Sequence, residues 1–146
     1  FELEYTGEDG LKHRPVMIHR VVLGSIERFI GVITEHFAGA FPTWLNPVQV
    51  KILPVTDRAN EYANCVREKL DALGYRVEVD GRNEKIGKKI REAQMEKVPY
   101  MLVVGDRDIE AGTVSPRHRA EGDLGAMELD KFVEILKDDV DNKRIK

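Results

Sequence analysis

From residue 48 onward, continuous apolar runs alternate with segments in which apolar residues recur every three or four positions. The apolar runs at residues 48–55 and 100–104 predict buried strands, because a strand covered on both faces carries apolar side chains throughout. Residues 76–79 predict a strand between them, and residues 113–119 offer one or two short strands in a closing hairpin. Strands that alternate with helical segments favour an α/β fold with parallel pairing, which the hairpin turns into a mixed sheet.

Three segments have the apolar spacing of amphipathic helices. The first is capped by Thr56 or Asp57 and ends at Gly74, the second covers residues 84–95, and the third covers residues 129–140. Their expected buried positions are Tyr62, Val66, Leu70, Leu73, Ile86, Ile90, Ala93, Leu129, Phe132, Val133, Leu136 and Val140. The basic positions of the second helix, expected away from the core, are Lys85, Lys88, Lys89 and Arg91.

The first forty residues have a different pattern. Residues 1–5 and 15–23 alternate as strands do and are joined by a polar turn with glycine at both ends. Ser25 is a suitable cap for a helix that ends at Gly39. Residues 40–47 contain two prolines and read as a linker, so we expect the domain boundary there.

Composition narrows the class of protein. Of 146 residues, 42% are hydrophobic and 34% charged, with a net charge of −3, as in an ordinary globular protein. The apolar runs are too short to span a bilayer, and residues 1–20 lack the apolar core of a signal peptide. The single cysteine, Cys65, fits a reducing compartment, so we expect a cytoplasmic protein. A chain that starts with Phe1 is expected to be a fragment of a longer protein.

Positive charge is concentrated after the predicted strand at residues 76–79. Between Arg82 and Arg91 there are five Lys or Arg residues and one acidic residue. By spacing alone, the commoner explanation of such a cluster is the solvated face of an amphipathic helix.

Two observations favour contact with RNA instead. Arg82 and Asn83 follow the carboxyl end of a strand, where open α/β sheets bind ligands, and Arg117, His118 and Arg119 form a second basic cluster. Lys and Arg side chains bind phosphates, while Asn and Arg side chains pair with the exposed base edges of a single-stranded loop. The sequence therefore predicts an RNA-binding surface on one end of the domain.

Three further motifs are weak by themselves. Gly81 and Gly87 do not form a phosphate loop, because the spacing is one residue too long and Lys89 stands where Ser or Thr would hold magnesium. Arg28 lies in the first turn of a helix and can bind a phosphate, but such a residue is more often a surface arginine. His19 is by default a packed or hydrogen-bonded strand histidine. No Ser-His-Asp or Cys-His catalytic set is recognisable.

Longer segments resemble one protein family. From Phe41 onward the chain resembles the C-terminal anticodon-binding domain of threonyl-tRNA synthetases in FPTWLNPVQVKILPV, RNEKIGKKIREAQ and VPYMLVVGDRDIEAGTVSPR. Upstream, RPVMIHRVVLGSIERFIGVITEHFAG resembles motif 3 of the catalytic core of the same enzymes. The resemblance implies a strand-helix remnant of the catalytic core at residues 1–39, a linker at 40–47, and at 48–146 a five-stranded mixed sheet with three helices.

The resemblance also implies roles for individual residues. It places anticodon readers at Asn83, Asp108 and Arg117, and the family commonly has Glu at the position of Asp108. The surrounding residues expected to contact tRNA are Arg82, Lys85, Lys88, Lys89 and Arg119. In the whole enzyme, a homodimer that uses Mg-ATP and zinc, Arg28 would bind the ATP phosphates and His19 would be one zinc ligand. The chain by itself is expected to bind the threonine anticodon stem-loop, to hold no cofactor and to catalyse nothing.

Three alternatives stay open at this point. The nearest is the equivalent domain of a prolyl, histidyl or glycyl synthetase, against which the MIHR and LGSIERFIGVITEHFAG segments favour the threonyl enzyme. The second is a non-catalytic RNA-binding paralogue. The third is a small-molecule-binding α/β domain, which would not be retained on RNA in a salt-dependent way.

Overall fold

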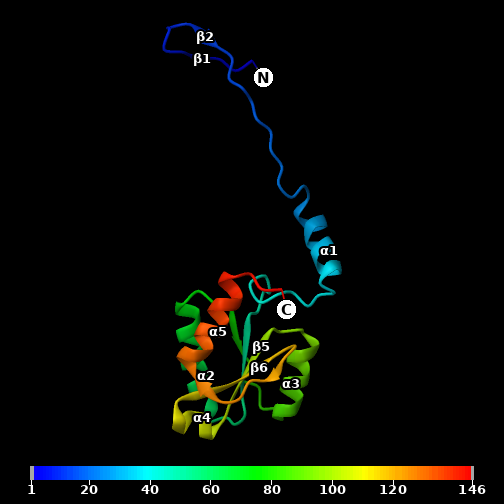
Figure 1. The fold of residues 1–146 in the computed structure, drawn as a ribbon, viewed down its shortest axis with the longest axis vertical. Helices are drawn as coiled ribbons and strands as arrows, with labels where there is room; N and C mark the ends of the chain where they lie inside the picture. Colours follow the sequence, from blue (N-terminus) through cyan, green and yellow to red (C-terminus); the bar gives the residue numbers. More distant parts are fainter. Residues whose placement is uncertain (1, 146) are drawn as a thin grey trace. The chain divides into compact units, whose positions relative to one another are not determined.

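The computed structural model describes residues 2–145, which divide into one unit up to Val32 and a second unit from Ile33 onward. The second unit contains a mixed sheet and the helices that cover it (Figure 1). Its elements after residue 48 are β3 (Val50–Pro54), α2 (Ala59–Ala72), β4 (Val77–Val79), α3 (Ile86–Met95), β5 (Tyr100–Val104), α4 (Asp106–Ala111), β6 (Thr113–His118), β7 (Gly122–Asp123), β8 (Met127–Glu128) and α5 (Leu129–Asp141).

The sheet confirms the predicted α/β fold with mixed pairing. Its strand order is β4-β3-β5-β6-β7, with β8 paired to β6 beside this path. β3 is parallel to both β4 and β5, because a helix returns the chain to the same end of the sheet between these strands. β6 is antiparallel to β5 and to the two-residue strands β7 and β8. The sheet thus has six strands, where five were predicted, because the closing segment splits into very short strands.

Helix α4 is a difference from the prediction. No helix was predicted at residues 106–111, but they form a six-residue helix. Such a helix is too short to show an apolar repeat, and none of its residues is buried. Within residues 49–145 there are therefore four helices, where the resemblance implied three.

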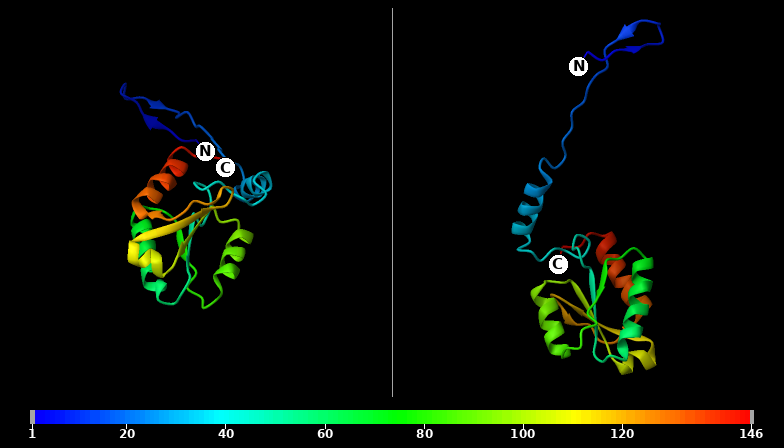
Figure 2. Two further views of the ribbon diagram at one scale, coloured as in Figure 1. Left: turned by 60° about the horizontal axis from the view of Figure 1, so that its bottom comes forward. Right: turned by 180° about the vertical axis from the view of Figure 1, so that it is seen from behind.

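The sheet separates two apolar layers. Helices α2 and α5 lie on one face and α3 lies on the other, as both views in Figure 2 show. Strand side chains alternate between the two faces, so Leu102 faces the first layer, whereas Leu53 and Met101 face the second. The helices complete these layers with Phe132 in the first and Ala93 in the second. The burial of Val66, Leu70, Phe132 and Leu136 confirms most of the predicted helix faces.

Two details of α2 were predicted wrongly. The residue before the helix is Arg58, without a side-chain hydrogen bond to the helix. The Thr56 hydroxyl instead donates to Asp106 Oδ1 at 3.2 Å, so it ties α2 to α4 rather than capping α2. Leu73 is 58% exposed because the helix has already ended at Ala72. Gly74 has a φ of +87°, as expected for the residue that terminates such a helix.

The first unit contains little regular structure. Strands β1 (Tyr5–Thr6) and β2 (Lys12–His13) form a small antiparallel ladder around the predicted polar turn. The predicted strand at residues 1–5 is reduced to this ladder, and Phe1 lies outside the described residues. The predicted strand at residues 15–23 is wrong: its backbone pairs with no strand in the described part of the chain, and Val16 is 88% exposed.

Helix α1 (Ile26–His36) begins as predicted. The Arg28 N–H donates to Ser25 Oγ at 3.4 Å, which makes Ser25 the cap. Gly39, with φ of +75°, follows the last turn, and its N–H donates to Thr34 O at 2.9 Å. None of the helices described between residues 2 and 145 is long and apolar enough to cross a membrane.

Candidate nucleic-acid interface

The turn between β4 and α3 holds Arg82 in place and leaves Asn83 exposed. Asp80, which is only 6% exposed, accepts hydrogen bonds from the Arg82 backbone N–H at 3.2 Å and from Arg82 Nε at 2.8 Å. Arg82 Nη2 lies 2.6 Å from Asp80 Oδ2 and 2.6 Å from Glu92 Oε2 on α3. Arg82 therefore connects the turn to the end of β4 and to α3, and Asn83 is the next residue in that turn.

The charge of Asp80 is part of this arrangement. Hydrogen bonds from the Arg82 side chain lower the pKa of Asp80 to about 2, although burial acts in the opposite direction. The carboxylate is therefore ionised at neutral pH. The carboxylates of Asp80 and Glu92 neutralise the charge of the Arg82 guanidinium. Arg82 therefore stabilises the turn and has little net positive charge left to attract a phosphate.

The lysines at the start of α3 differ in how available they are. Lys85 precedes the helix and is exposed. Lys88 Nζ lies 2.6 Å from Glu84 Oε1, and this bond raises the pKa of Lys88 and lowers that of Glu84. Both ammonium groups reach solvent, so either can approach a phosphate, with Glu84 as a local competitor at Lys88.

Lys89 is not on the solvated face, and that prediction is wrong. Its side chain is buried, with 4% exposure, and Nζ donates to the carbonyl oxygens of Pro54 and Asp80 at 3.0 Å each. The reason is helical spacing: Lys89 lies three residues after Ile86 and four before Ala93, on the face that packs against the sheet. Lys89 therefore offers no surface to a phosphate.

Asp108 lies in the first turn of α4 and is half-buried. Its Oδ2 accepts the Gly105 N–H at 2.9 Å, which caps the helix. Its Oδ1 accepts the hydroxyls of Thr113 at 3.3 Å and Ser115 at 3.1 Å. Both carboxylate oxygens thus have partners within the protein, and Asp108 connects α4 to the start of β6.

Arg117 lies on β6 and faces the same side of the sheet as Ser115. On β6 the residues alternate between half-buried and buried, and Thr113, Ser115 and Arg117 are the half-buried set. His118, predicted as part of the basic cluster, is in the buried set with 3% exposure, so that part of the prediction is wrong. Arg117 is opposite Met101, which places it on the face that α3 partly covers. Its Nη1 lies 3.4 Å from Asp123 Oδ2, and its side chain is 33% exposed. A guanidinium in this position is accessible and oriented by a neighbouring carboxylate.

Arg119 has a structural role that its sequence position does not reveal. Its Nη1 donates to Lys97 O at 2.7 Å, and its Nη2 donates to Ala40 O at 3.3 Å and Phe41 O at 3.0 Å. Burial lowers the pKa of this guanidinium. Arg119 thus joins the predicted linker to the sheet, and these bonds use three of its five N–H donors, which counts against the predicted RNA contact.

The two sides of α3 face different parts of the sheet. Glu92 pairs with Arg82 and Glu96 pairs with Lys51, so this side of the helix lies toward β4. Residues about half a turn away lie toward β5 and β6, and of these Gln94 is exposed. Helix α3 packs over β3, so the same face of β6 stays accessible.

Three further polar residues that are at least partly exposed, Arg91, Gln94 and Ser115, lie beside the predicted contacts and were not named as RNA contacts from the sequence. Gln94 follows Arg91 by three positions, which places the two side chains on one face of the helix. Ser115 precedes Arg117 by two positions, which places both on one face of a strand. Asp108 on α4 accepts a hydrogen bond from Ser115, which lies on the same face of β6 as Arg117, whereas Asn83 follows the edge strand β4.

In the first unit, Arg28 and His19 are both exposed. His19 Nε2 lies 3.0 Å from Met17 Sδ. Residues 2–145 contain no group of three His, Cys, Asp or Glu side chains placed to hold a metal. A zinc centre with three protein ligands therefore does not fit the described residues by themselves.

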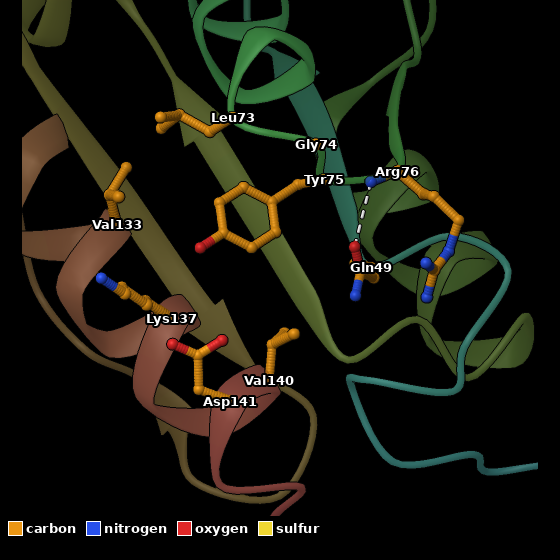
Figure 3. A pocket seen from close by; sticks show the side chains of 9 residues that line it. All are labelled: Gln49, Leu73, Gly74, Tyr75, Arg76, Val133, Lys137, Val140 and Asp141. Atoms are coloured by element: carbon orange, nitrogen blue, oxygen red, sulfur yellow. Dashed lines mark hydrogen bonds between the residues drawn. The ribbon is translucent and has the colours of Figure 1, made fainter.

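A pocket of about 460 Å³, drawn in Figure 3, is lined in part by the residues just before β3 and β4. It therefore lies at the opposite end of these strands from Asn83, which follows β4. Tyr75 projects between α2 and α5, toward Lys137 and Asp141. Burial, with a smaller contribution from Asp141, raises the pKa of Tyr75. Gln49 Oε1 in this pocket accepts a hydrogen bond from the Arg76 N–H, so at least one polar group of the pocket stabilises the fold. The pocket shares no residue with the turn that carries Asn83 or with the exposed lysines Lys85 and Lys88.

The family model of the anticodon binding domain matches residues 49–139. The chain is similar to the threonine–tRNA ligase of Desulforamulus reducens, with 63% identity over 99% of this chain and 23% of the relative. It is also similar to the threonine–tRNA ligase of Caldanaerobacter subterraneus subsp. tengcongensis, with 65% identity over 94% of this chain and 22% of the relative. The chain thus spans less than a quarter of the length of these relatives.

Two solved structures from Cryptosporidium parvum have the same fold. The RNA binding domain of its threonyl-tRNA synthetase matches with a TM-score of 0.80 and 35% identity, covering 94% of this chain and 35% of that chain. Its prolyl-tRNA synthetase matches with a TM-score of 0.61 and 27% identity, covering 69% of this chain and 23% of that chain. The longer and closer match is to the threonyl enzyme, which favours it over the prolyl alternative.

Proposed function

Since the chain belongs to the anticodon binding domain family, we propose that it recognises the anticodon loop of threonine tRNA as part of a threonine–tRNA ligase. The observation that carries this proposal is the 63% identity to a threonine–tRNA ligase over 99% of the chain. The chain by itself binds RNA and catalyses nothing, because aminoacylation needs a complete catalytic core, and the relatives are more than four times longer.

The width of the sheet fits a short single-stranded loop. Asn83 follows β4, and Arg117 lies on β6, three strand positions away. Neighbouring strands are about 4.8 Å apart, so three strand positions amount to about 14 Å across the sheet. Asn83 also lies five residues beyond Glu78, the residue of β4 in register with Arg117, so the two positions are offset along the strands as well. Asn83 and Arg117 are therefore far enough apart to contact different nucleotides of one loop.

The proposed roles follow from accessibility. The Asn83 amide and the Arg117 guanidinium are available for base edges, and they differ in donor pattern, so they favour different bases. Lys85 and Lys88 are available for phosphates. Asp108, whose oxygens already have partners, acts by ordering the Ser115 side of β6.

In the whole enzyme, further residues would contribute to catalysis. We propose that Arg28 binds the terminal phosphates of ATP with magnesium, and that His19 supplies one of several zinc ligands, the others coming from segments outside this chain. Zinc would bind the amino and hydroxyl groups of threonine. We further propose that the enzyme is a homodimer in the cytoplasm.

A filter-binding titration tests the RNA proposal. The chain is titrated against the threonine anticodon stem-loop and against a stem-loop with the same composition and a scrambled loop. We expect tighter binding to the threonine loop and a loss of binding to both as salt rises. Equal affinity for the two loops would contradict anticodon recognition, and no binding to either would contradict RNA binding by this domain.

A further inference from the structure

One charged side chain below the candidate interface is buried. Lys89 is 4% exposed, although an ammonium is costly to bury unless its hydrogen bonds are satisfied. Its Nζ has two carbonyl acceptors, Pro54 O at the end of β3 and Asp80 O just after β4, each at 3.0 Å. Lys89 therefore fastens the carboxyl ends of two parallel strands to helix α3.

The same contacts continue into the turn that carries Asn83. Lys89 holds the backbone of Asp80, and the Asp80 carboxylate binds both the backbone N–H and the guanidinium of Arg82. Arg82 in turn pairs with Glu92 on α3. Every step of this chain is a direct hydrogen bond of 2.6 to 3.2 Å. Asn83 follows Arg82 directly, so these hydrogen bonds also fix the position of the Asn83 backbone.

From this geometry we propose that Lys89 is a positioning residue for the base that Asn83 reads. This inference rests on the proposed anticodon recognition. A hydrogen bond to a base edge weakens steeply when its donor angle departs from linearity, so an amide on a loose turn discriminates poorly. Lys89 makes no contact with RNA and acts through the backbone of residues 80–83.

The alternative is that Lys89 only stabilises the fold. Lys51 provides the matched control for that alternative, because it also connects β3 to the α3 region: it lies on β3 and pairs with Glu96 at the end of α3. Its side chain is 11% exposed, and its described ionic partners are Glu78 and Glu96, both outside the turn. Replacing either lysine by Met removes the charge of a largely buried side chain, but only the Lys89 replacement releases the turn.

The experiment compares Lys89→Met and Lys51→Met by filter binding, with thermal unfolding measured for each. The probes are the threonine anticodon stem-loop and three loops that each change one anticodon base. We expect Lys89→Met to lower discrimination at one base by about tenfold, the value of a good base contact, while the salt slope stays unchanged. Lys51→Met should keep the discrimination at a comparable loss of thermal stability.

Asp80→Asn provides a second variant, which keeps the carbonyl acceptor of Lys89 and weakens the hold on Arg82. Asp80→Asn should relax discrimination at the same base, and it is the deciding variant if Lys89→Met does not fold. If Lys89→Met folds and keeps its discrimination, the proposal is overturned. If Lys89→Met is unfolded, unchanged discrimination in Asp80→Asn overturns it. Equal loss in Lys51→Met would also overturn it. Failure of the proposed function itself is distinguishable, because then the unmodified chain shows no discrimination.

Discussion

At the scale of single residues, Asn83 is expected to contribute to selectivity. Replacing it by Ala removes one amide from the exposed turn, and we expect a loss of about 1–3 kcal/mol on the threonine anticodon stem-loop. Discrimination should relax at one base only. Filter binding against single-base loop variants measures both effects.

Asn64 provides the control for this substitution. It is an exposed asparagine on α2, which lies on the other face of the sheet, so Asn64→Ala should leave RNA binding unchanged. If Asn83→Ala weakens the threonine loop and the scrambled loop equally, Asn83 does not read a base.

The accessible lysines are expected to act differently from Asn83. The double variant Lys85→Ala and Lys88→Ala should weaken all loops alike, because phosphates carry no sequence information. For a single-stranded loop, the salt slope should fall by roughly 0.7 for each phosphate that the variant no longer neutralises. Since Lys88 already pairs with Glu84, its share is expected to be the smaller one.

Binding titrations at several salt concentrations measure this slope. Lys131→Ala, an exposed lysine on α5, is the control and should not change it. A double variant with an unchanged slope would show that Lys85 and Lys88 belong only to the solvated face of α3.

At the scale of elements, the connection from β4 to α3 should depend on pH through Asp80. The folded pKa of about 2 lies below the ordinary value of 3.8, so the ionised carboxylate stabilises the folded state above pH 3.8. This stabilisation is lost as the pH falls through about 2. The shift corresponds to about 2 kcal/mol.

Urea unfolding of the native chain and of Asp80→Asn between pH 6 and pH 2 measures this contribution. The difference in the free energy of unfolding should be largest above pH 4 and should shrink toward pH 2. A difference that is constant over this range would show that the Arg82 hydrogen bonds do not hold the pKa of Asp80 down.

At the scale of the whole molecule, the two units should differ in resistance to proteolysis. The first unit exposes Val16 by 88%, Ile18 by 83% and Val21 by 77%, and within the described residues its only ladder has two residues per strand. The second unit buries two apolar layers around its sheet. Segments without buried apolar contacts open easily and are cleaved first.

Limited proteolysis with light scattering checks this expectation. Cleavage should remove the first unit and leave a resistant monomeric fragment that begins between residues 33 and 48. A larger species in which residues 14–25 are protected would show that the exposed apolar side chains pair with a second copy. Protection in a strict monomer would contradict the expectation.

The sequence by itself determined the features that depend on neighbouring residues. Apolar runs and helical spacing predicted the positions of the main strands and helices, because burial of one face requires that periodicity. Gly39 and Gly74 marked helix ends, because both adopt a positive φ that other residues disfavour. The segments after residue 48 identified the family, which the match to residues 49–139 confirms.

Only the tertiary structure decided which charged side chains are accessible. Lys89 and Arg119 resemble their exposed neighbours in sequence, but their donors bind carbonyl oxygens that lie 9 to 79 residues away. Residues 15–23 have the alternation of a strand, but a strand forms only where a partner accepts its hydrogen bonds. Charge and periodicity are local properties, whereas burial and pairing depend on segments that only the fold brings together.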